Sequence, residues 1–268
     1  MNRLKLTSCM APNADGFVTS LAQYLAIQLV RPIESCLDIP WQDREKAFDS
    51  GDIQICWICG LPYIWKVDKP APQVELLATP VLKASRYKNA PVYYSDVVVH
   101  KDSQLFSFAD LEGMRWSYNE PLSHSGAYVV RDHLASMGKD CSYFGKVIES
   151  GAHQNSIQMI LDKQVDASAI DSWVLELELI KNPQLASQLR IIETLGPSSF
   201  PPWMISKQVP AELRRKIRNI LTKMHLDPMG RSILNKVEIS HFAATEDRDY
   251  DPIRKMAQNA EKIEWAVT

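Results

Sequence analysis

Ser123, His124, Ser125 and Gly126 form the turn whose residue types are best suited to bind or transform a ligand. The alternating segment at residues 114–118 predicts a strand before this turn, and the apolar residues after it recur at helical spacing. Hydroxyl and backbone N–H groups at a helix start lie at the positive end of the helix dipole, where an oxyanion is stabilised. Serine also begins many helices simply as an N-cap. The turn is therefore either a helix cap or an anion-binding cup.

Further polar side chains follow other predicted strands, at the edge of a sheet where the carboxyl ends of parallel strands meet. They are Ser8, Tyr63, His153 and Asp171. Tyr63 is a candidate for stacking on a ligand or hydrogen bonding to it, with plain packing as the alternative. His153 precedes a helical pattern and is either a ligand group or an ordinary surface or core histidine. Asp171 either contacts a ligand or caps the helix predicted from Trp173.

Patterns for catalysis and metal binding are missing from the sequence. The serines lack a G-x-S-x-G elbow, the six histidines show no H-x-x-x-H spacing, and no glycine-rich phosphate loop is present. We therefore predict no catalytic residue, no bound metal and no cofactor.

Five cysteines are an odd number, in a chain of 268 residues that is too long to need disulfide bonds in order to fold. Cys56 and Cys59 have the spacing of a redox pair. Their neighbours Ile53, Ile55 and Ile58 favour a buried strand instead, because a redox pair normally lies exposed at a helix start.

Charge and hydropathy limit the expected partners. The formal net charge is −2 and the basic residues are dispersed, so nucleic acid is not an expected partner. No run reaches the roughly 18 apolar residues of a membrane span. The sequence enters a predicted strand at residue 4 without an apolar segment of signal-peptide length. We expect either a cytoplasmic protein or one whose leader was removed.

The order of predicted elements favours an α/β fold. Strands and helices alternate over residues 1–92, with a short strand at residues 39–41, which predicts a mainly parallel sheet with helices on its faces. Extended segments at residues 90–100 and 196–202 then serve as two hinge crossings between lobes.

We predict a two-lobed clamshell in which each lobe is a mixed, mainly parallel sheet flanked by helices. Residues 1–92 with 201–268 form lobe I, and residues 93–200 form lobe II. Both termini, including a last helix from residue 251, then belong to lobe I, and a ligand is expected in the cleft between the lobes.

Six stretches stand in one order along the chain. They are Tyr-Tyr-Ser-Asp-Val-Val-Val at 93–99, Asp-Leu-Glu-Gly at 110–113, Pro-Leu-Ser-His-Ser-Gly at 121–126, Gly-Ala-His at 151–153, Val-Asp-Ala at 165–167 with Asp171, and His-Phe at 241–242 followed by Asp-Tyr-Asp at 249–251. In these stretches the chain resembles the phosphate, phosphite and phosphonate substrate-binding proteins of ABC transporters, members of the type 2 periplasmic binding protein superfamily. The resemblance covers most of the chain from about Tyr93 onward.

This resemblance implies a clamshell that closes on a small tetrahedral oxyanion without catalysing a reaction. It places the turn of Ser123, His124, Ser125 and Gly126 on the anion, together with His153, with Asp171 at or beside an acidic ligand position and with Tyr63 as the aromatic residue from lobe I. It also implies an ABC transporter permease as partner, a monomer, and a periplasmic or cell-surface location. The family commonly has a small hydroxyl residue where His124 stands, and we expect an imidazole there that becomes charged near pH 6.5.

Two other functions are compatible with the same fold. One is a cytosolic enzyme in which Cys59 or His153 is the reactive group, and the other is a sensory module that passes ligand occupancy to a partner protein. The missing leader favours both, whereas the lack of an evident nucleophile–base pair argues against the enzyme.

Overall fold

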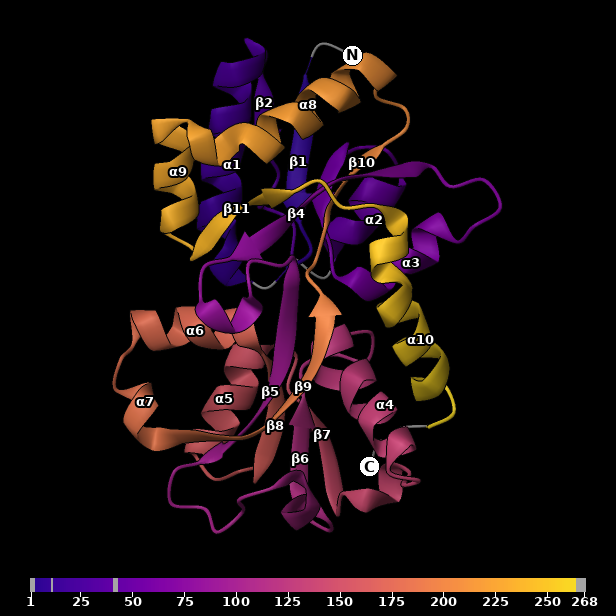
Figure 1. Cartoon of the computed structure of the whole chain (residues 1–268). Helices are drawn as coiled ribbons and strands as arrows, with labels where there is room; N and C mark the ends of the chain where they lie inside the picture. Colours follow the sequence, from indigo (N-terminus) through magenta and orange to yellow (C-terminus); the bar gives the residue numbers. More distant parts are fainter. Residues whose placement is uncertain (1–2, 11, 41–42, 264–268) are drawn as a thin grey trace. The chain divides into compact units, whose positions relative to one another are not determined.

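The computed structural model describes residues 3–10, 12–40 and 43–263. The chain forms two compact units, which are coloured by sequence in Figure 1. Unit 1 comprises the described residues up to Val92 and Ser199–Asp251, and unit 2 comprises Tyr93–Ser198 with the described residues from Pro252 on.

Unit 1 is built on a six-stranded mixed sheet with strand order β11-β4-β10-β3-β1-β2. Its strands are β1 (Leu4–Ser8), β2 (Ile33–Ser35), β3 (Ile55–Trp57), β4 (Val74–Leu82), β10 (Trp203–Ser206) and β11 (Ile239–Ala243). β1 pairs in parallel with β2 and β3, whereas β10 is antiparallel to β3 and β4, and β11 is antiparallel to β4. The predicted alternation of strand and helix thus gives the parallel part of this sheet.

Helices lie on both sides of this sheet, with α1 and α9 to its left and α2 and α3 to its right in Figure 1. They are α1 (Asp15–Leu29), α2 (Arg44–Asp49), α3 (Gly60–Val67), α8 (Ala211–Lys223) and α9 (Pro228–Asn235), with single turns at Pro12–Ala14, Ser85–Tyr87, Met224–Leu226 and Asp247–Tyr250. α1 buries Phe17, Leu21 and Leu25, which recur every fourth residue along one face. It ends at Val30, whose left-handed backbone (φ 49°) stops the helix before Pro32.

Trp57 on β3 lies at the centre of the unit 1 core. Its buried indole stacks on Trp203 of β10 with ring centroids 5.5 Å apart, and it meets the edge of the Phe17 ring at 5.5 Å. The indole Nε1 donates to the carbonyl oxygen of Pro201 at 2.9 Å. Aromatic pairs of this kind add to the stabilisation from area burial, so the end of β3 is held firmly where the chain turns into α3.

Unit 2 is built on a five-stranded mixed sheet with strand order β7-β6-β8-β5-β9. Its strands are β5 (Val92–His100), β6 (Arg115–Tyr118), β7 (Lys146–Glu149), β8 (Ala167–Asp171) and β9 (Leu189–Ser199). β6 pairs in parallel with β7 and β8, and β5 is antiparallel to β8. Because β6, β7 and β8 run the same way, the segments that follow them lie at one edge of the sheet.

Helices also flank this second sheet, with α5 and α6 to its left and α4 to its right in Figure 1. They are α4 (Val129–Ser136), α5 (His153–Leu161), α6 (Ser172–Lys181), α7 (Leu185–Gln188) and α10 (Asp251–Ala260), with single turns at Phe108–Leu111 and Cys141–Tyr143. Ser107 and Asp110 form a capping box at the first of these turns.

Two expectations about the elements are wrong, and one strand was not expected. The second strand is β2, and residues 39–40 form no strand, while residue 41 lies outside the described residues. The linker expected at residues 196–202 is partly strand, because β9 continues to Ser199. The strand β11 is missing from the sequence prediction, because Ile239–Ala243 lacks a clean alternation of apolar and polar residues.

The last helix packs with unit 2, whereas the sequence interpretation assigned it to lobe I. The Nε of Arg131 on α4 donates to the carbonyl oxygen of Ile263 at 2.6 Å, and the amide of Asn259 donates to the carboxylate of Asp132 at 2.9 Å. An amphipathic pattern shows that one face of a helix is buried but not which element covers it, so the assignment by chain order failed.

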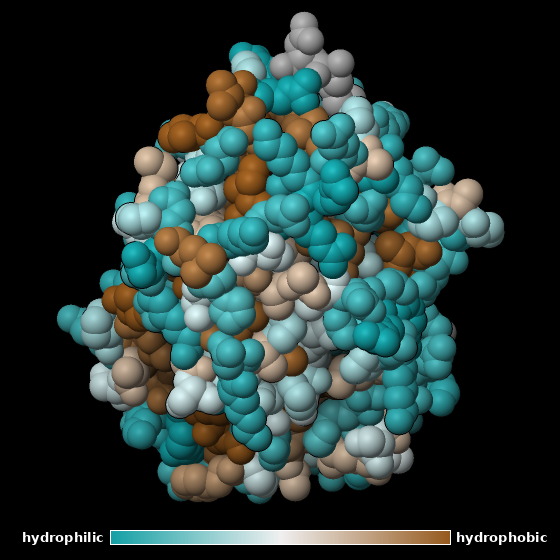
Figure 2. Space-filling view, turned by 45° about the horizontal axis from the view of Figure 1, so that its top comes forward, coloured by the Kyte–Doolittle hydropathy of each residue, from teal (hydrophilic) through white to brown (hydrophobic). Residues whose placement is uncertain are grey.

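Hydrophilic residues cover most of the face shown in Figure 2, with smaller hydrophobic patches between them. Among the helices of the described residues, none combines the length and the apolar composition needed to cross a bilayer.

Candidate functional site

The turn after β6 is a helix start, as predicted. Ser123 is the N-cap residue of η5 (His124–Tyr128), one turn of π-helix that continues into α4. The Ser123 Oγ accepts a hydrogen bond from the backbone N–H of Gly126 at 3.1 Å, and its carbonyl oxygen accepts from the N–H groups of Ala127 and Tyr128. The capping role of Ser123 is therefore confirmed.

Gly126 is required by the close approach of Asn119. A Cβ atom at residue 126 would lie 1.9 Å from the Asn119 Oδ1 and 3.3 Å from the Asn119 backbone nitrogen. The Asn119 side chain is buried, and its Oδ1 has no hydrogen-bond partner among the described residues. The first helical turn thus packs directly against the end of β6, with a polar amide between them.

Ser125 joins this turn to the start of α5. Its Oγ lies 2.9 Å from the Nε2 of His153, the first residue of α5, and 3.5 Å from the Ser123 Oγ. All three side chains are more than nine-tenths buried. The structure therefore brings three of the predicted site residues together, at the point where two helices begin.

The His153 imidazole is neutral at physiological pH, because burial lowers its pKa to about 3. Its Nδ1 is buried without a hydrogen-bond partner among the described residues. The ring therefore offers one nitrogen to the Ser125 hydroxyl, and the direction of that hydrogen bond depends on the tautomer.

The His124 side chain contacts the end of β9. Its Nε2 lies 2.9 Å from the Ser198 Oγ, and its ring centroid lies 6.5 Å from that of Tyr93. The side chain is fully buried, and burial lowers its pKa to about 3. The expectation that this imidazole becomes charged near pH 6.5 is wrong, because the sequence does not reveal how completely the ring is desolvated.

Asp171 caps α6, one of its two predicted roles. Its Oδ1 accepts from the backbone N–H groups of Trp173 at 2.9 Å and Val174 at 3.3 Å. Burial raises its pKa to about 7, reinforced by the nearby Asp96 carboxyl and opposed by the two backbone hydrogen bonds. Near neutral pH this carboxyl therefore exists both as an acid and as a carboxylate. Its contact with a ligand stays a prediction.

Glu120, directly after Asn119, is an acidic residue that the sequence interpretation left out. Partial burial, together with the neighbouring Glu149 carboxylate, raises its pKa to about 7. Glu149 also accepts a hydrogen bond from the Tyr118 hydroxyl at 3.3 Å. A lone glutamate in a turn carries no sequence signal, because the neighbouring carboxyl, that of Glu149, comes from the end of β7, far away in the chain.

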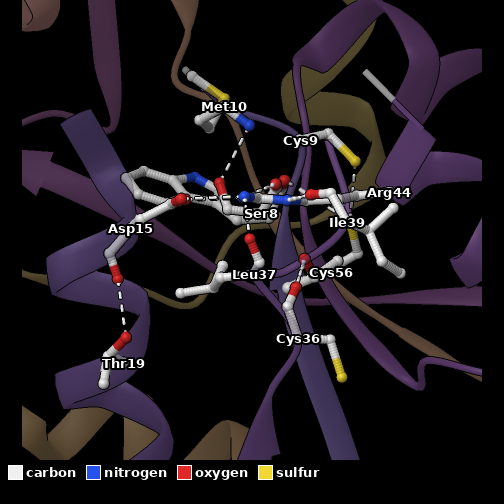
Figure 3. A network of polar contacts seen from close by, with 12 residues as sticks. Ser8, Cys9, Met10, Asp15, Thr19, Cys36, Leu37, Ile39, Arg44 and Cys56 are labelled. Atoms are coloured by element: carbon white, nitrogen blue, oxygen red, sulfur yellow. Dashed lines mark hydrogen bonds and ion pairs between the residues drawn. The ribbon is translucent and has the colours of Figure 1, made fainter. Parts of the chain in front are cut away.

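In unit 1, Ser8 belongs to a local network at the end of β1 (Figure 3). Its Oγ accepts from the backbone N–H of Met10 at 3.0 Å, and its carbonyl oxygen accepts from Arg44 at 3.1 Å. The buried Arg44 guanidinium also forms two hydrogen bonds with the Asp15 carboxylate, at 2.7 and 2.9 Å, and donates to the carbonyl oxygen of Leu37. Arg44 thus organises the end of β1, where Ser8 lies, and no sequence pattern indicated this role.

Tyr63 is buried within unit 1. Its hydroxyl donates to the Asp247 Oδ1 at 3.0 Å, and its ring packs against Tyr250 with centroids 4.7 Å apart. These contacts agree with the packing role that was the alternative for this residue. Its role, and that of Ser8, toward a ligand stay predictions.

Comparison with known proteins supports the resemblance inferred from the sequence. Residues 17–250 match the family described as "ABC transporter, phosphonate, periplasmic substrate-binding protein". The chain is 23% identical over 210 residues to the phosphonates-binding periplasmic protein of Escherichia coli (strain K12). The aligned region covers 76% of this chain and 60% of that protein. It is 20% identical over 230 residues to the probable ABC transporter phosphite binding protein PhnD1 of Prochlorococcus marinus (strain MIT 9301), covering 81% of this chain and 75% of that one.

Solved structures show the same fold. A binding protein component of an ABC phosphonate transporter from Pseudomonas aeruginosa aligns with a TM-score of 0.84 at 18% identity, over 97% of this chain and 87% of that chain. PhnD1 from Prochlorococcus marinus in complex with methylphosphonate also gives 0.84, at 19% identity, over 98% of this chain and 99% of that chain. The fold is thus the two-lobed α/β clamshell fold, and the match over residues 17–250 makes this chain a member of the phosphonate periplasmic substrate-binding protein family of ABC transporters.

Proposed function

We propose that this chain captures a small tetrahedral oxyanion, of the phosphonate, phosphite or phosphate type, and delivers it to an ABC transporter permease. The family match and the methylphosphonate bound by PhnD1 support the class of ligand. The observation that carries the proposal is the contact between Ser125 and His153, because it joins the starts of two helices in one buried cluster.

The chemistry of this cluster suits an anion. The hydroxyls of Ser123 and Ser125 each have a proton to donate, and they lie 3.5 Å apart, so two oxygens of one tetrahedral group are within reach of both. Helix starts add unpaired backbone N–H groups and a partial positive charge. An anion that arrives beside His153 favours the protonated imidazole and so raises its pKa from the low value of the empty cluster.

The enzyme alternative is not favoured, although Ser125 and His153 lie within hydrogen-bond distance in the manner of a nucleophile and its base. A histidine whose pKa is about 3 is a poor base at neutral pH. Its Nδ1 also lacks an orienting acid among the described residues. The family is a substrate-binding component of transporters, so capture rather than conversion of the ligand is the proposed activity.

A thermal-shift screen tests the proposal with phosphate, phosphite, methylphosphonate and sulfate as probes. We expect at least one phosphorus oxyanion to raise the melting temperature of the wild type but not that of the Ser123→Ala/Ser125→Ala variant. Ser136→Ala, at the far end of α4 and exposed, is the matched control and should respond like the wild type. A double variant that is still stabilised by the same anion would place the binding site elsewhere.

A further inference from the structure

Two thiols from separate strands meet in unit 1. The Sγ of Cys9 lies 3.4 Å from the Sγ of Cys56. Both residues are labelled in Figure 3. Cys9 directly follows β1, and Cys56 is the middle residue of β3. Both are thiols in this structure. Cys56 therefore lies beside Cys9, although the spacing in the sequence links it with Cys59.

The backbone around the two thiols is fixed. β1 and β3 pair in parallel, with Thr7 opposite Cys56, and the N–H of Cys9 donates to the carbonyl oxygen of Trp57 at 2.8 Å. Arg44 holds the preceding residue, Ser8, through its carbonyl oxygen. Closing the bond requires the two sulfurs to approach from 3.4 Å to about 2 Å by rotation of the side chains, and any shift of backbone falls at Cys9, which lies just beyond the last residue of β1.

The two thiols differ in access. Cys9 is partly exposed, whereas the Cys56 side chain is fully buried. Burial, together with the neighbouring Cys9, also raises the pKa of the Cys56 thiol well above its ordinary value. An oxidant in solution therefore reacts first with Cys9. Cys56 then lies close enough to attack the mixed disulfide that forms at Cys9.

We propose that Cys9 and Cys56 are a dithiol that small-molecule disulfides oxidise to an intramolecular disulfide bond. In the first step the Cys9 thiolate attacks one sulfur of the oxidant, so that a mixed disulfide forms and one thiolate leaves. In the second step the Cys56 sulfur attacks the Cys9 Sγ, gives up its proton to the departing thiolate and expels a second thiol. Two cysteine thiols are oxidised, and one molecule of disulfide is reduced to two thiols.

The compartment and the topology give this bond a role. Proteins of this family are periplasmic, and disulfides form and persist in that oxidising compartment. The bond would tie Cys9, the residue after β1, to β3. It would close a long loop that contains α1, β2 and α2, and so restrict the unfolded chain. Oxidation should therefore stabilise unit 1.

Mass spectrometry and peptide mapping of the full chain test the assignment, with oxidised glutathione as the oxidant. The mapping uses a Cys36→Ser/Cys59→Ser variant, so that the tryptic peptides carrying Cys9 and Cys56 hold one cysteine each. We expect the loss of two hydrogen atoms in mass, a Cys9–Cys56 crosslinked peptide, and a higher melting temperature that dithiothreitol reverses. In the wild type, a Cys56–Cys59 crosslink in place of Cys9–Cys56 would overturn the proposal.

Single variants separate the two steps. Cys56→Ala removes the second thiol, so glutathione should stay attached to Cys9, and the mass of the tryptic peptide that carries Cys9 should rise by one glutathionyl group. Cys59→Ser is the control and should form the crosslink at the wild-type rate. If Cys56→Ala lost two hydrogens as the wild type does, or if the Cys59→Ser variant formed no crosslink, the Cys9–Cys56 assignment would be wrong.

Discussion

Asp171 offers a pH-dependent prediction because its carboxyl is buried at the start of α6. Its side chain is 3% exposed, and burial raises the pKa from an ordinary value of 3.8 to about 7. Between about pH 4 and pH 7 the folded carboxyl keeps a proton that the unfolded carboxyl has lost. The folded state therefore binds more protons, and the free energy of unfolding decreases as the pH rises through this window.

The Asp171→Asn variant has no carboxyl at this position, so its free energy of unfolding should not decrease in this way as the pH rises. Asparagine keeps a side-chain oxygen that accepts from the N–H groups of Trp173 and Val174, so the cap of α6 is preserved. A pKa difference of about three units corresponds to about 4 kcal/mol in full, and to about 3 kcal/mol between about pH 4.5 and about pH 8.5. Relative to the wild type, the variant should gain that amount of stability as the pH rises.

Urea denaturation of both proteins at the two pH values measures the difference. Asp140→Asn is a matched control, because Asp140 is an exposed cap whose pKa is lowered by hydrogen bonds from Ser142. It should show a small change of the opposite sign, since an ionised carboxylate is the favoured form there. If Asp171→Asn shows the same pH dependence as the wild type, the burial argument for Asp171 is refuted.

Three further substitutions test the local structure by denaturation. Gly126→Ala should lower the free energy of unfolding by about 1–3 kcal/mol, because the added Cβ displaces the Asn119 amide. Adding Asn119→Ala should restore part of that stability. A Gly126→Ala variant as stable as the wild type would contradict the close approach of Asn119. Tyr63→Phe should cost about 0.5–1.5 kcal/mol by removing the hydrogen bond to Asp247, and no change would mean that this bond is absent in solution. Arg44→Ala should cost about 3 kcal/mol, because several hydrogen bonds to buried groups are lost at once, and a cost below about 1 kcal/mol would argue against its organising role.

The sequence allowed the main elements and the helix start at Ser123 to be predicted, because these depend on local spacing. The alternation of strands and helices predicted strands that run the same way. The hydroxyls of Ser123 and Ser125 follow the end of one such strand, and the helix start at His153 follows the end of another. Their convergence in unit 2 agrees with that inference.

Features that depend on distant contacts or on burial could not be predicted. Arg44 and Ser198 act through partners far away in the chain, and neither stands in a recognisable pattern. The charge expected on His124 was wrong because the sequence does not report the desolvation of a single ring. The same limit applies to Cys9, which lies 47 positions before Cys56 and touches it only through the pairing of two strands.

The central claim is that Ser123, Ser125 and His153 bind the anion. A crystal structure of the complex with methylphosphonate tests this claim most directly. We predict phosphonyl oxygens at about 3 Å from the two serine Oγ atoms and from the His153 Nε2. A methylphosphonate bound elsewhere on the chain, with the Ser125–His153 hydrogen bond unchanged, would contradict the claim.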